Sequence, residues 1–324
     1  MRVLTQREFI FDTDAPTPSC HASTVLPLED GTVLAAWFGG TAEGKDDVDI
    51  YLARRTNGAW QPPQRITAAP DVPHWNPVLF RKADGSVILF FKVGKKIARW
   101  QTYFALSADG GLSWTDPAQL VPGDASGGRG PVKNKPIRLP DGTIAAPAST
   151  EQPDWLAFID RSADDGKTWE KQSVIPARKL AGGKQIPMIQ PTLWLSADGN
   201  LHALLRTSRG HAYTSVSPDG GRTWAKAVPT AIRNPNSGLD VVKAPDGRLF
   251  LVNNPCAKNW GARAPLGLFV SQDEGETWTL LQTLEKRRSH DDEYSYPAIV
   301  CDGTSLHVTY TWQRKKIAYW QIEL

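Results

Sequence analysis

The chain has 324 residues and a net charge of +3, and its basic residues are scattered, so a nucleic-acid partner is disfavoured. No apolar run approaches the length of a membrane span and no basic-then-apolar leader opens the sequence. We therefore expect a cytoplasmic protein with no membrane partner. The three cysteines have no metal-ligand spacing, and the sequence implies neither a metal nor an organic cofactor.

The predicted elements are strands from one end of the chain to the other. The first is the β-rich segment 3–11, and the next two, 24–28 and 33–37, are joined by an Asp-Gly turn. Asp-Gly between two β-rich runs is the strongest short-range signal for a hairpin. The dipeptide recurs at regular intervals along the whole chain, at Asp30-Gly31, Asp84-Gly85, Asp141-Gly142, Asp198-Gly199, Asp246-Gly247 and Asp302-Gly303.

A second repeat, Ser-x-Asp-x-Gly-x-x-Trp, has the same period. Four copies end at Trp114, Trp169, Trp224 and Trp278, and a worn copy ends at Trp60, so the tryptophans recur every 54 or 55 residues. In each copy we expect the Asp to accept backbone N–H bonds, the Gly to adopt a positive φ, and the Trp to cover the turn. We expect these boxes to serve folding rather than binding.

A repeat of this length over the whole chain predicts one structural unit copied six times. Six four-stranded sheets make an all-β, six-bladed β-propeller, which we expect to be a single domain over 1–324. Another box would be due just beyond Leu324, so the sixth blade lacks its outer strand. We expect segment 3–11 to supply that strand and remove an open sheet edge.

A propeller binds ligands at one mouth of its central tunnel, and we expect the residues about eight positions from each Asp-Gly turn to lie there. Before the turns these residues are His21, Asn76, Asn134, Gln190, Asn236 and Tyr294. After the turns they are Trp37, Lys92, Ser149 with Glu151 just beyond it, Arg206, Asn253 and Tyr310. This set predicts a hydrogen-bonding cup, and its cations Lys92 and Arg206 predict an anionic ligand such as a carboxylate.

The boxes, the six hairpins and the polar mouth together resemble the sialidase (neuraminidase) superfamily, in the branch known as predicted neuraminidases. The resemblance implies arginines that hold a substrate carboxylate, a tyrosine nucleophile and an aspartate acid/base. Residue by residue, it implies these roles for Arg206 in Leu-Leu-Arg-Thr-Ser, Arg263 in Arg-Ala-Pro-Leu, Tyr294 in Glu-Tyr-Ser-Tyr-Pro, and Asp47 or Asp46 in the acidic loop after Gly39-Gly40.

Two positions depart from the family pattern. His21, in Cys-His-Ala-Ser, stands where an arginine belongs, and Gln190 stands where the family has the glutamate that activates the tyrosine. An amide cannot accept a phenolic proton, so Glu151, Glu293 or His21 remains as a candidate base. The amides of Asn76, Asn134, Gln190 and Asn236 suit sugar hydroxyls, and Trp37 is a candidate for stacking on a sugar ring.

Three functions fit this sequence. The first is an exo-acting glycoside hydrolase that releases a terminal acidic sugar from a glycan. The second is a lyase or hydrolase acting on uronate- or rhamnose-containing glycans, with His21 or Tyr294 taking a proton. The third is a glycan-binding propeller without catalytic activity.

Overall fold

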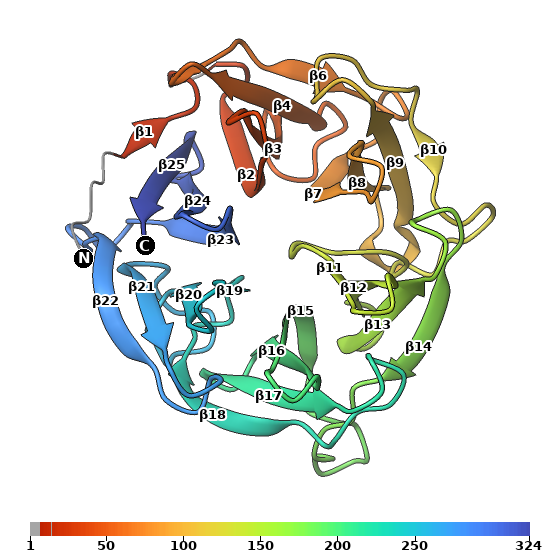
Figure 1. The fold of residues 1–324 in the computed structure, drawn as a ribbon, viewed down its shortest axis with the longest axis vertical. Coiled ribbons are helices and arrows are strands. Elements are labelled where there is room, and N and C mark those ends of the chain that lie inside the picture. Colours follow the sequence, from red (N-terminus) through yellow and green to blue (C-terminus); the bar gives the residue numbers. More distant parts are fainter. Residues whose placement is uncertain (1–6, 14) are drawn as a thin grey trace. The chain divides into compact units, whose positions relative to one another are not determined.

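The computed structural model describes residues 7–13 and 15–324, and β-strands dominate this part of the chain. The one helical element in these residues is the short 3-10 turn η1 (Ile97–Arg99). The strands form six sheets, drawn in Figure 1, and every recorded strand pair is antiparallel. This confirms the predicted all-β class. No helix within the described residues is long and apolar enough to cross a membrane.

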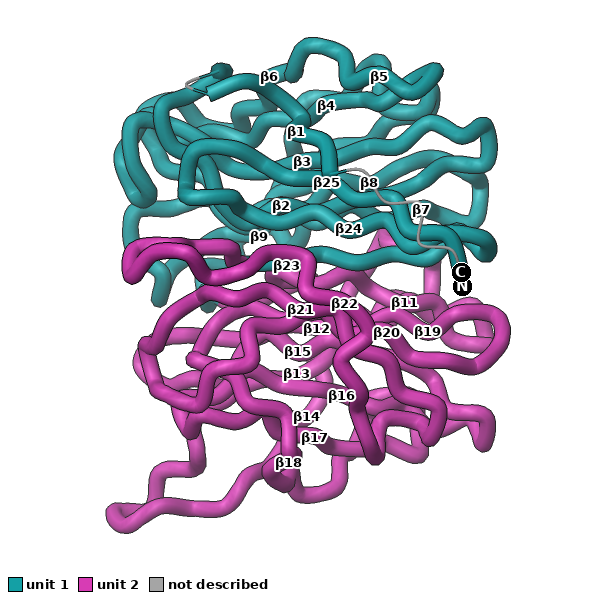
Figure 2. Tube along the Cα trace, turned by 90° about the vertical axis from the view of Figure 1, so that its left-hand side faces the viewer, with its two compact units in different colours: residues 1–127, 296–324 teal, residues 128–295 magenta. Residues whose placement is uncertain are grey.

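The chain divides into two compact units (Figure 2), of which unit 1 contains residues 1–127 and 296–324. Its first sheet has five strands: β2 (Ser19–Pro27), β3 (Val33–Gly40), β4 (Asp49–Thr56), β5 (Ala59–Trp60) and β6 (Gln64–Ile66). The second has four: β7 (His74–Arg81), β8 (Val87–Val93), β9 (Gln101–Ser107) and β10 (Ala118–Gln119). The third has β23 (Tyr294–Cys301), which begins at the end of unit 2, β24 (Ser305–Trp312), β25 (Lys316–Glu323) and β1 (Glu8–Phe9).

Unit 2 contains residues 128–295 and three four-stranded sheets. The first comprises β11 (Ile137–Arg138), β12 (Ile144–Thr150), β13 (Leu156–Ser162) and β14 (Glu170–Val174). The second comprises β15 (Met188–Leu195), β16 (Leu201–Thr207), β17 (His211–Ser217) and β18 (Val228–Arg233). The third comprises β19 (Asp240–Lys243), β20 (Leu249–Asn253), β21 (Leu266–Ser271) and β22 (Thr279–Glu285). The six sheets are the six blades of the predicted β-propeller.

The N-terminal strand completes the last sheet, as predicted. Glu8 lies opposite Tyr319 in the pairing of β1 with β25, and Ile10 N–H donates to Ile317 at 3.0 Å. The Glu8 carboxylate also pairs with Arg55 at 2.7 Å. The remainder of the predicted strand, residues 3–6, lies outside the described part of the chain.

The Asp-Gly turn occupies the predicted place in every sheet, and the four full boxes occupy theirs in four of the sheets. Each Asp-Gly turn joins the first and second strands, and at Asp30 the carboxylate accepts the Thr32 N–H at 2.9 Å while Gly31 has φ +81°. Each box follows the third strand. In the second box, Gly166 N–H donates to Ser162 Oγ at 2.8 Å and Thr168 N–H donates to Asp164 Oδ1 at 2.8 Å. Burial raises the pKa of Asp164, but hydrogen bonds from the Thr168 hydroxyl and N–H, the Ser162 hydroxyl and the Lys167 N–H favour the ionised form and hold that pKa at about 2.

Each unit has its own apolar core, because alternate strand residues point to the face that packs against the neighbouring sheet. The largest cluster of unit 1 includes Leu34, Phe38, Leu52, Leu89 and Phe91, all at most 2% exposed. That of unit 2 includes Ala157, Ile159, Met188, Leu201 and Leu205, all fully buried. Burial of each large apolar side chain contributes about 1.5–3 kcal/mol.

Candidate functional site

One residue in or just before the first strand of each sheet has a positive φ, which side chains other than glycine rarely adopt. These residues are Ala22 (+55°), Asn76 (+45°), Lys133 (+66°), Gln190 (+52°), Asn236 (+63°) and Tyr296 (+52°). The pairing register shifts at this place in β2, β7 and β15, as it does at a β-bulge. In these three sheets the bulge turns one side chain out of the regular alternation.

In three blades the residue with positive φ differs from the residue predicted as equivalent. Ala22 stands in the place expected for His21, Lys133 in that of Asn134, and Tyr296 in that of Tyr294. A bulge inserts a residue, so counting back a fixed number from the turn misses it by one or two positions. The predictions at Asn76, Gln190 and Asn236 fall on the residues with positive φ themselves.

Arg206 is the centre of a polar cluster in unit 2. It lies near the end of β16 and is 3% exposed. Its Nε donates to Asn236 Oδ1 at 2.7 Å, and its Nη1 donates to Gln190 Oε1 at 3.1 Å. A guanidinium has only donors, so both amides must turn their oxygens toward it. Two neutral acceptors therefore orient Arg206 without neutralising its charge.

Donor and acceptor pairing also sets the orientation of the neighbouring amides, those of Asn236 and Asn134. With its oxygen on Arg206, Asn236 donates from Nδ2 to Asn259 Oδ1 at 2.9 Å. The buried Lys133 Nζ donates to Asn134 Oδ1 at 2.8 Å, and Asn134 Nδ2 then donates to the carbonyls of Gln190 and Pro191 at 3.0 and 3.1 Å. Asn134 therefore supports the bulge that presents Gln190.

Two tryptophans flank the Arg206 guanidinium. Its Cζ lies 5.5 Å from the ring centroid of Trp155 and 5.6 Å from that of Trp260, within the range of a cation–π interaction. The Trp260 side chain is unusual because the residue is 62% exposed and has φ +54°. An exposed aromatic ring on a strained backbone indicates a role outside the core.

Arg263 and Tyr294 lie on neighbouring segments of unit 2. Arg263 Nη1 lies 3.1 Å from Glu293 Oε1, and the Arg263 carbonyl accepts the Tyr294 N–H at 2.9 Å. Ser295 Oγ donates to the same Glu293 oxygen at 2.7 Å. A cavity of about 210 Å³ is lined by Trp260, Gly261, Arg263, Asp291, Asp292 and Glu293. Trp260 therefore contacts Arg206 and shares a cavity with Arg263.

In unit 1, His21 and Tyr296 lie side by side. Their ring centroids are 4.2 Å apart, and His21 Nδ1 is 2.9 Å from Thr311 Oγ1. His21 is 2% exposed, whereas Tyr296 is partly buried. Tyr294, the tyrosine expected from the family resemblance, is 4% exposed. Two residues of β23 are thus candidates for the tyrosine role.

Asp47 lies in the exposed loop between β3 and β4, in unit 1. Its carboxylate accepts the N–H of Thr41 at 3.0 Å and also the Thr41 hydroxyl. The hydroxyl bond is the main cause of a lowered pKa at Asp47. A general acid needs a pKa near the working pH, so Asp47 would have to leave Thr41 to act as one. Asp46 forms an ion pair with Lys95 at 2.7 Å.

Trp37 and Lys92, for which binding roles were predicted, both have buried side chains. Trp37 is fully buried in unit 1 and stacks on Phe11 at 4.7 Å, so it is a core residue. Lys92 is also fully buried, and its Nζ donates to Thr102 Oγ1 at 2.8 Å. The spacing of these residues from the Asp-Gly turn could not reveal this burial.

Asn76 and Glu151 remain candidates. Asn76 is the bulge residue of β7 and is 5% exposed. Glu151 follows β12 directly and is partly buried. Sequence reasoning missed Tyr296, Trp260 and Asn259 as parts of the site. The Tyr-Ser-Tyr-Pro segment carried a signal for Tyr296, whereas nothing in the repeats marked the loop that contains Trp260.

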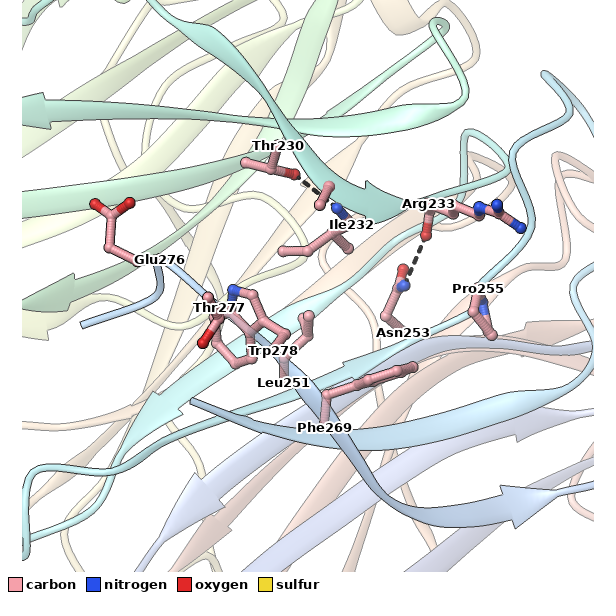
Figure 3. Close-up of a pocket in the computed structure, with 11 residues that line it drawn as sticks. Thr230, Ile232, Arg233, Leu251, Asn253, Pro255, Phe269, Glu276, Thr277 and Trp278 are labelled. Carbon is pink, nitrogen blue, oxygen red and sulfur yellow. Dashed lines mark hydrogen bonds between the residues drawn. The ribbon is translucent and has the colours of Figure 1, made fainter. Parts of the chain in front are cut away.

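A larger cavity in unit 2 lies apart from Arg206 and Arg263. It is a cavity of about 370 Å³ between β18 and β20, and Figure 3 shows its apolar wall of Ile232, Leu251, Phe269 and Trp278. Arg233 and Glu276 lie at its rim. Neither Arg206 nor Arg263 lines it, so we place the candidate site at the amide cluster instead.

The fold and the boxes define the class of protein as an Asp-box β-propeller. A family model described as a BNR repeat-like domain matches residues 31–308. The chain belongs to that family. A search of curated proteins found no match.

Solved structures with the same fold support this assignment. The Hadza microbial sialidase Hz136 is 18% identical with a TM-score of 0.80, over 98% of this chain and 68% of that one. A protein of unknown function from Dyadobacter fermentans is 16% identical with a TM-score of 0.78, over 100% and 99% of the two chains. The intramolecular trans-sialidase from Ruminococcus gnavus is 15% identical with a TM-score of 0.72, over 97% of each chain. These likenesses show the fold.

Proposed function

We propose that the protein is an exo-acting glycoside hydrolase that releases a terminal acidic sugar from a glycan. The observation that carries this proposal is the Arg206 cluster of unit 2. Gln190 and Asn236 hold the guanidinium through neutral oxygens, so its positive charge is not cancelled by these two partners. Arg263 lines the neighbouring cavity beside Trp260. Two arginines and an aromatic ring form a suitable receptor for a sugar that bears a carboxylate.

The neighbouring groups favour a tyrosine as the nucleophile. Tyrosine is the known exception to the rule of two carboxylates in glycosidases, and it avoids placing an anionic nucleophile beside the sugar carboxylate. Tyr294 and Tyr296 lie on β23 next to Glu293, a carboxylate already in hydrogen-bond contact with Ser295. We assign the proton-accepting role to Glu293, because Gln190 is an amide. Asp47 remains the proposed acid, after release from Thr41.

A second candidate function rests on the His21–Tyr296 pair of unit 1. A histidine ring 4.2 Å from a tyrosine ring is an arrangement suited to proton transfer. In a uronate lyase, one of these groups would remove the C5 proton and the other would protonate the leaving oxygen. The C5–H and glycosidic C4–O bonds break, and a C4=C5 double bond forms in the product.

The test is turnover of a fluorogenic α-sialoside beside a uronate-terminated glycan, with absorbance followed for unsaturated product. We expect release of sialic acid, abolished by phenylalanine at Tyr294 or at Tyr296 and unchanged by Tyr213→Phe, a buried tyrosine of unit 2. Unsaturated product from the uronate substrate alone would establish the lyase. Binding of both glycans without any product would show a glycan-binding protein and overturn both enzymatic functions.

A further inference from the structure

Arg161 is a buried cation that the mechanism above does not use. It lies in β13 of unit 2, one residue before the second box, and is 6% exposed. Its Nε has no hydrogen-bond partner among the residues that the structure describes. Its Nη2 is 3.8 Å from Asp141 Oδ2, which is too long for a hydrogen bond. A buried guanidinium normally has closer partners, because burial of an unpaired charge costs several kcal/mol.

A second cation lies close to the first. Arg222, an exposed residue of the third box, faces Arg161, and its repulsion adds to the effect of burial in lowering the pKa of Arg161. Both arginines line a cavity of about 250 Å³ between the first two sheets of unit 2, together with Leu139, Pro140, Asp141, Leu195, Gly199, Asp219 and Gly220. Since a water occupies about 30 Å³ in the liquid, this space accommodates a small ion with several waters.

The carboxylates beside this cavity accept hydrogen bonds from residues of their own turns. Asp219 accepts hydrogen bonds from Ser217 Oγ at 2.8 Å and from the Thr223 N–H and hydroxyl at 2.8 and 2.6 Å. Asp141, whose side chain is 59% exposed, accepts the Thr143 N–H at 2.9 Å. Glu170 also faces Arg161, but from the exposed strand β14. The acidic groups thus reduce the local charge without forming a close pair with Arg161.

The glycines of the turns keep the cavity open. A Cβ on Gly220 would lie 2.9 Å from Leu139 and 3.8 Å from Arg161 Nη2, so only glycine leaves this wall clear. The cavity is also distinct from the Arg206 cluster. Leu195 lines the cavity, whereas Gln190 contacts Arg206, and five residues of β15 separate them by about 16 Å.

From these observations we propose that Arg161 and Arg222 form a binding site for a small inorganic oxyanion such as phosphate or sulfate. The anion accepts hydrogen bonds from the terminal nitrogens of Arg161 and Arg222, in the forked geometry that guanidinium groups offer to oxyanions. It also screens the repulsion between the two arginines. Because the site lies at the box end of the blades, it stabilises the fold and takes no part in catalysis.

The test is the melting temperature of the whole protein in a chloride buffer, with phosphate added at constant ionic strength. A ligand that binds only the folded state raises stability with its concentration, by about 2.7 kcal/mol at one hundred times Kd. We expect a saturable rise for the wild type. We expect no rise for Arg161→Met, which keeps the side-chain volume, and an unchanged rise for Arg248→Met, whose arginine pairs with Asp246 at 2.6 Å.

Two further measurements test the proposed anion site. Arg161→Met is expected to be at least as stable as the wild type without phosphate, because it removes a buried charge whose paired carboxylate, that of Asp141, lies 3.8 Å away. Asp141→Asn, which removes the carboxylate 3.8 Å from Arg161, is expected to bind phosphate more tightly. The proposal is overturned if phosphate gives the wild type no saturable rise, if Arg161→Met keeps that rise, or if Asp141→Asn loses it.

Discussion

The guanidinium of Arg206 donates to Oε1 of Gln190 at 3.1 Å, so a neutral amide contacts the arginine where the family resemblance led us to expect a carboxylate. A carboxylate at that place would pair with Arg206 and reduce its attraction for an anionic sugar. An amide at this place orients the guanidinium and adds no negative charge beside it. In the proposed function, glutamine at position 190 therefore favours binding of the acidic sugar over activation of the tyrosine.

Gln190→Glu is expected to weaken the binding of free N-acetylneuraminic acid at least tenfold, or about 1.4 kcal/mol, because the new carboxylate neutralises Arg206. Titration calorimetry measures this directly. The matched control is Gln185→Glu, a glutamine of unit 2 whose Oε1 accepts the Ala177 N–H instead. Unchanged affinity in Gln190→Glu would contradict the role given to the amide.

Trp260→Gly is expected to weaken sugar binding while the free energy of unfolding stays within about 1 kcal/mol of the wild-type value. Glycine relieves the positive φ of +54°, which offsets its greater freedom in the unfolded chain. The lost ring is 62% exposed, so little core packing is removed. Chemical denaturation and calorimetry together check this. A loss of several kcal/mol in stability with unchanged affinity would show that Trp260 is structural.

Asp164→Ala is expected to lower the free energy of unfolding by about 1–3 kcal/mol, because it leaves the N–H groups of Lys167 and Thr168 without their acceptor. The control is Asp154→Ala, which removes an exposed ion pair with Lys184 and should cost less than about 1 kcal/mol. Urea denaturation compares the two. Equal effects would contradict the folding role assigned to the box.

The pH dependence of stability reports on Lys133. Complete burial lowers its pKa from 10.5 to about 7, although Asp240 opposes the shift, and the charges of Lys135 and Arg206 add to it. Between pH 7 and about 10 the unfolded chain holds a proton that the folded chain has released. The contribution of Lys133 to stability therefore rises with pH in that window and is constant below it.

Comparison of the wild type with Lys133→Met isolates the contribution of Lys133 to the free energy of unfolding. The stability difference, wild type minus variant, is expected to grow in favour of the wild type from pH 7 to pH 10. Urea denaturation across this range measures it. A difference that does not change with pH would contradict the lowered pKa.

Most of the fold could be predicted from the sequence because each repeated motif forms its turn through interactions between residues that are adjacent in the chain. An Asp-Gly turn such as Asp30-Gly31 and a box such as Ser162 to Trp169 each determine a hairpin from a few adjacent residues. Their spacing then gives the number of sheets. The pairing of β1 with β25 also followed, since a missing outer strand needs a partner from the other end of the chain.

The site was harder to predict because backbone irregularities build it. The residues with positive φ at Ala22, Lys133 and Tyr296 differ from the predicted equivalents by one or two positions. A period-two pattern also cannot tell which face of an inner strand is buried, so it did not predict the burial of Trp37 and Lys92. Trp260 lies in an irregular loop whose conformation depends on contacts distant in sequence, such as that between Asn236 and Asn259.

The central claim is that Arg206 holds the carboxylate of a terminal acidic sugar during its release. The most direct measurement compares kcat/KM for a fluorogenic α-sialoside with that for its uncharged methyl ester, in the wild type and in Arg206→Met. We predict that the wild type prefers the free acid by at least a hundredfold and that Arg206→Met loses most of this preference. Equal rates for acid and ester in the wild type, or an unchanged preference in Arg206→Met, would contradict it.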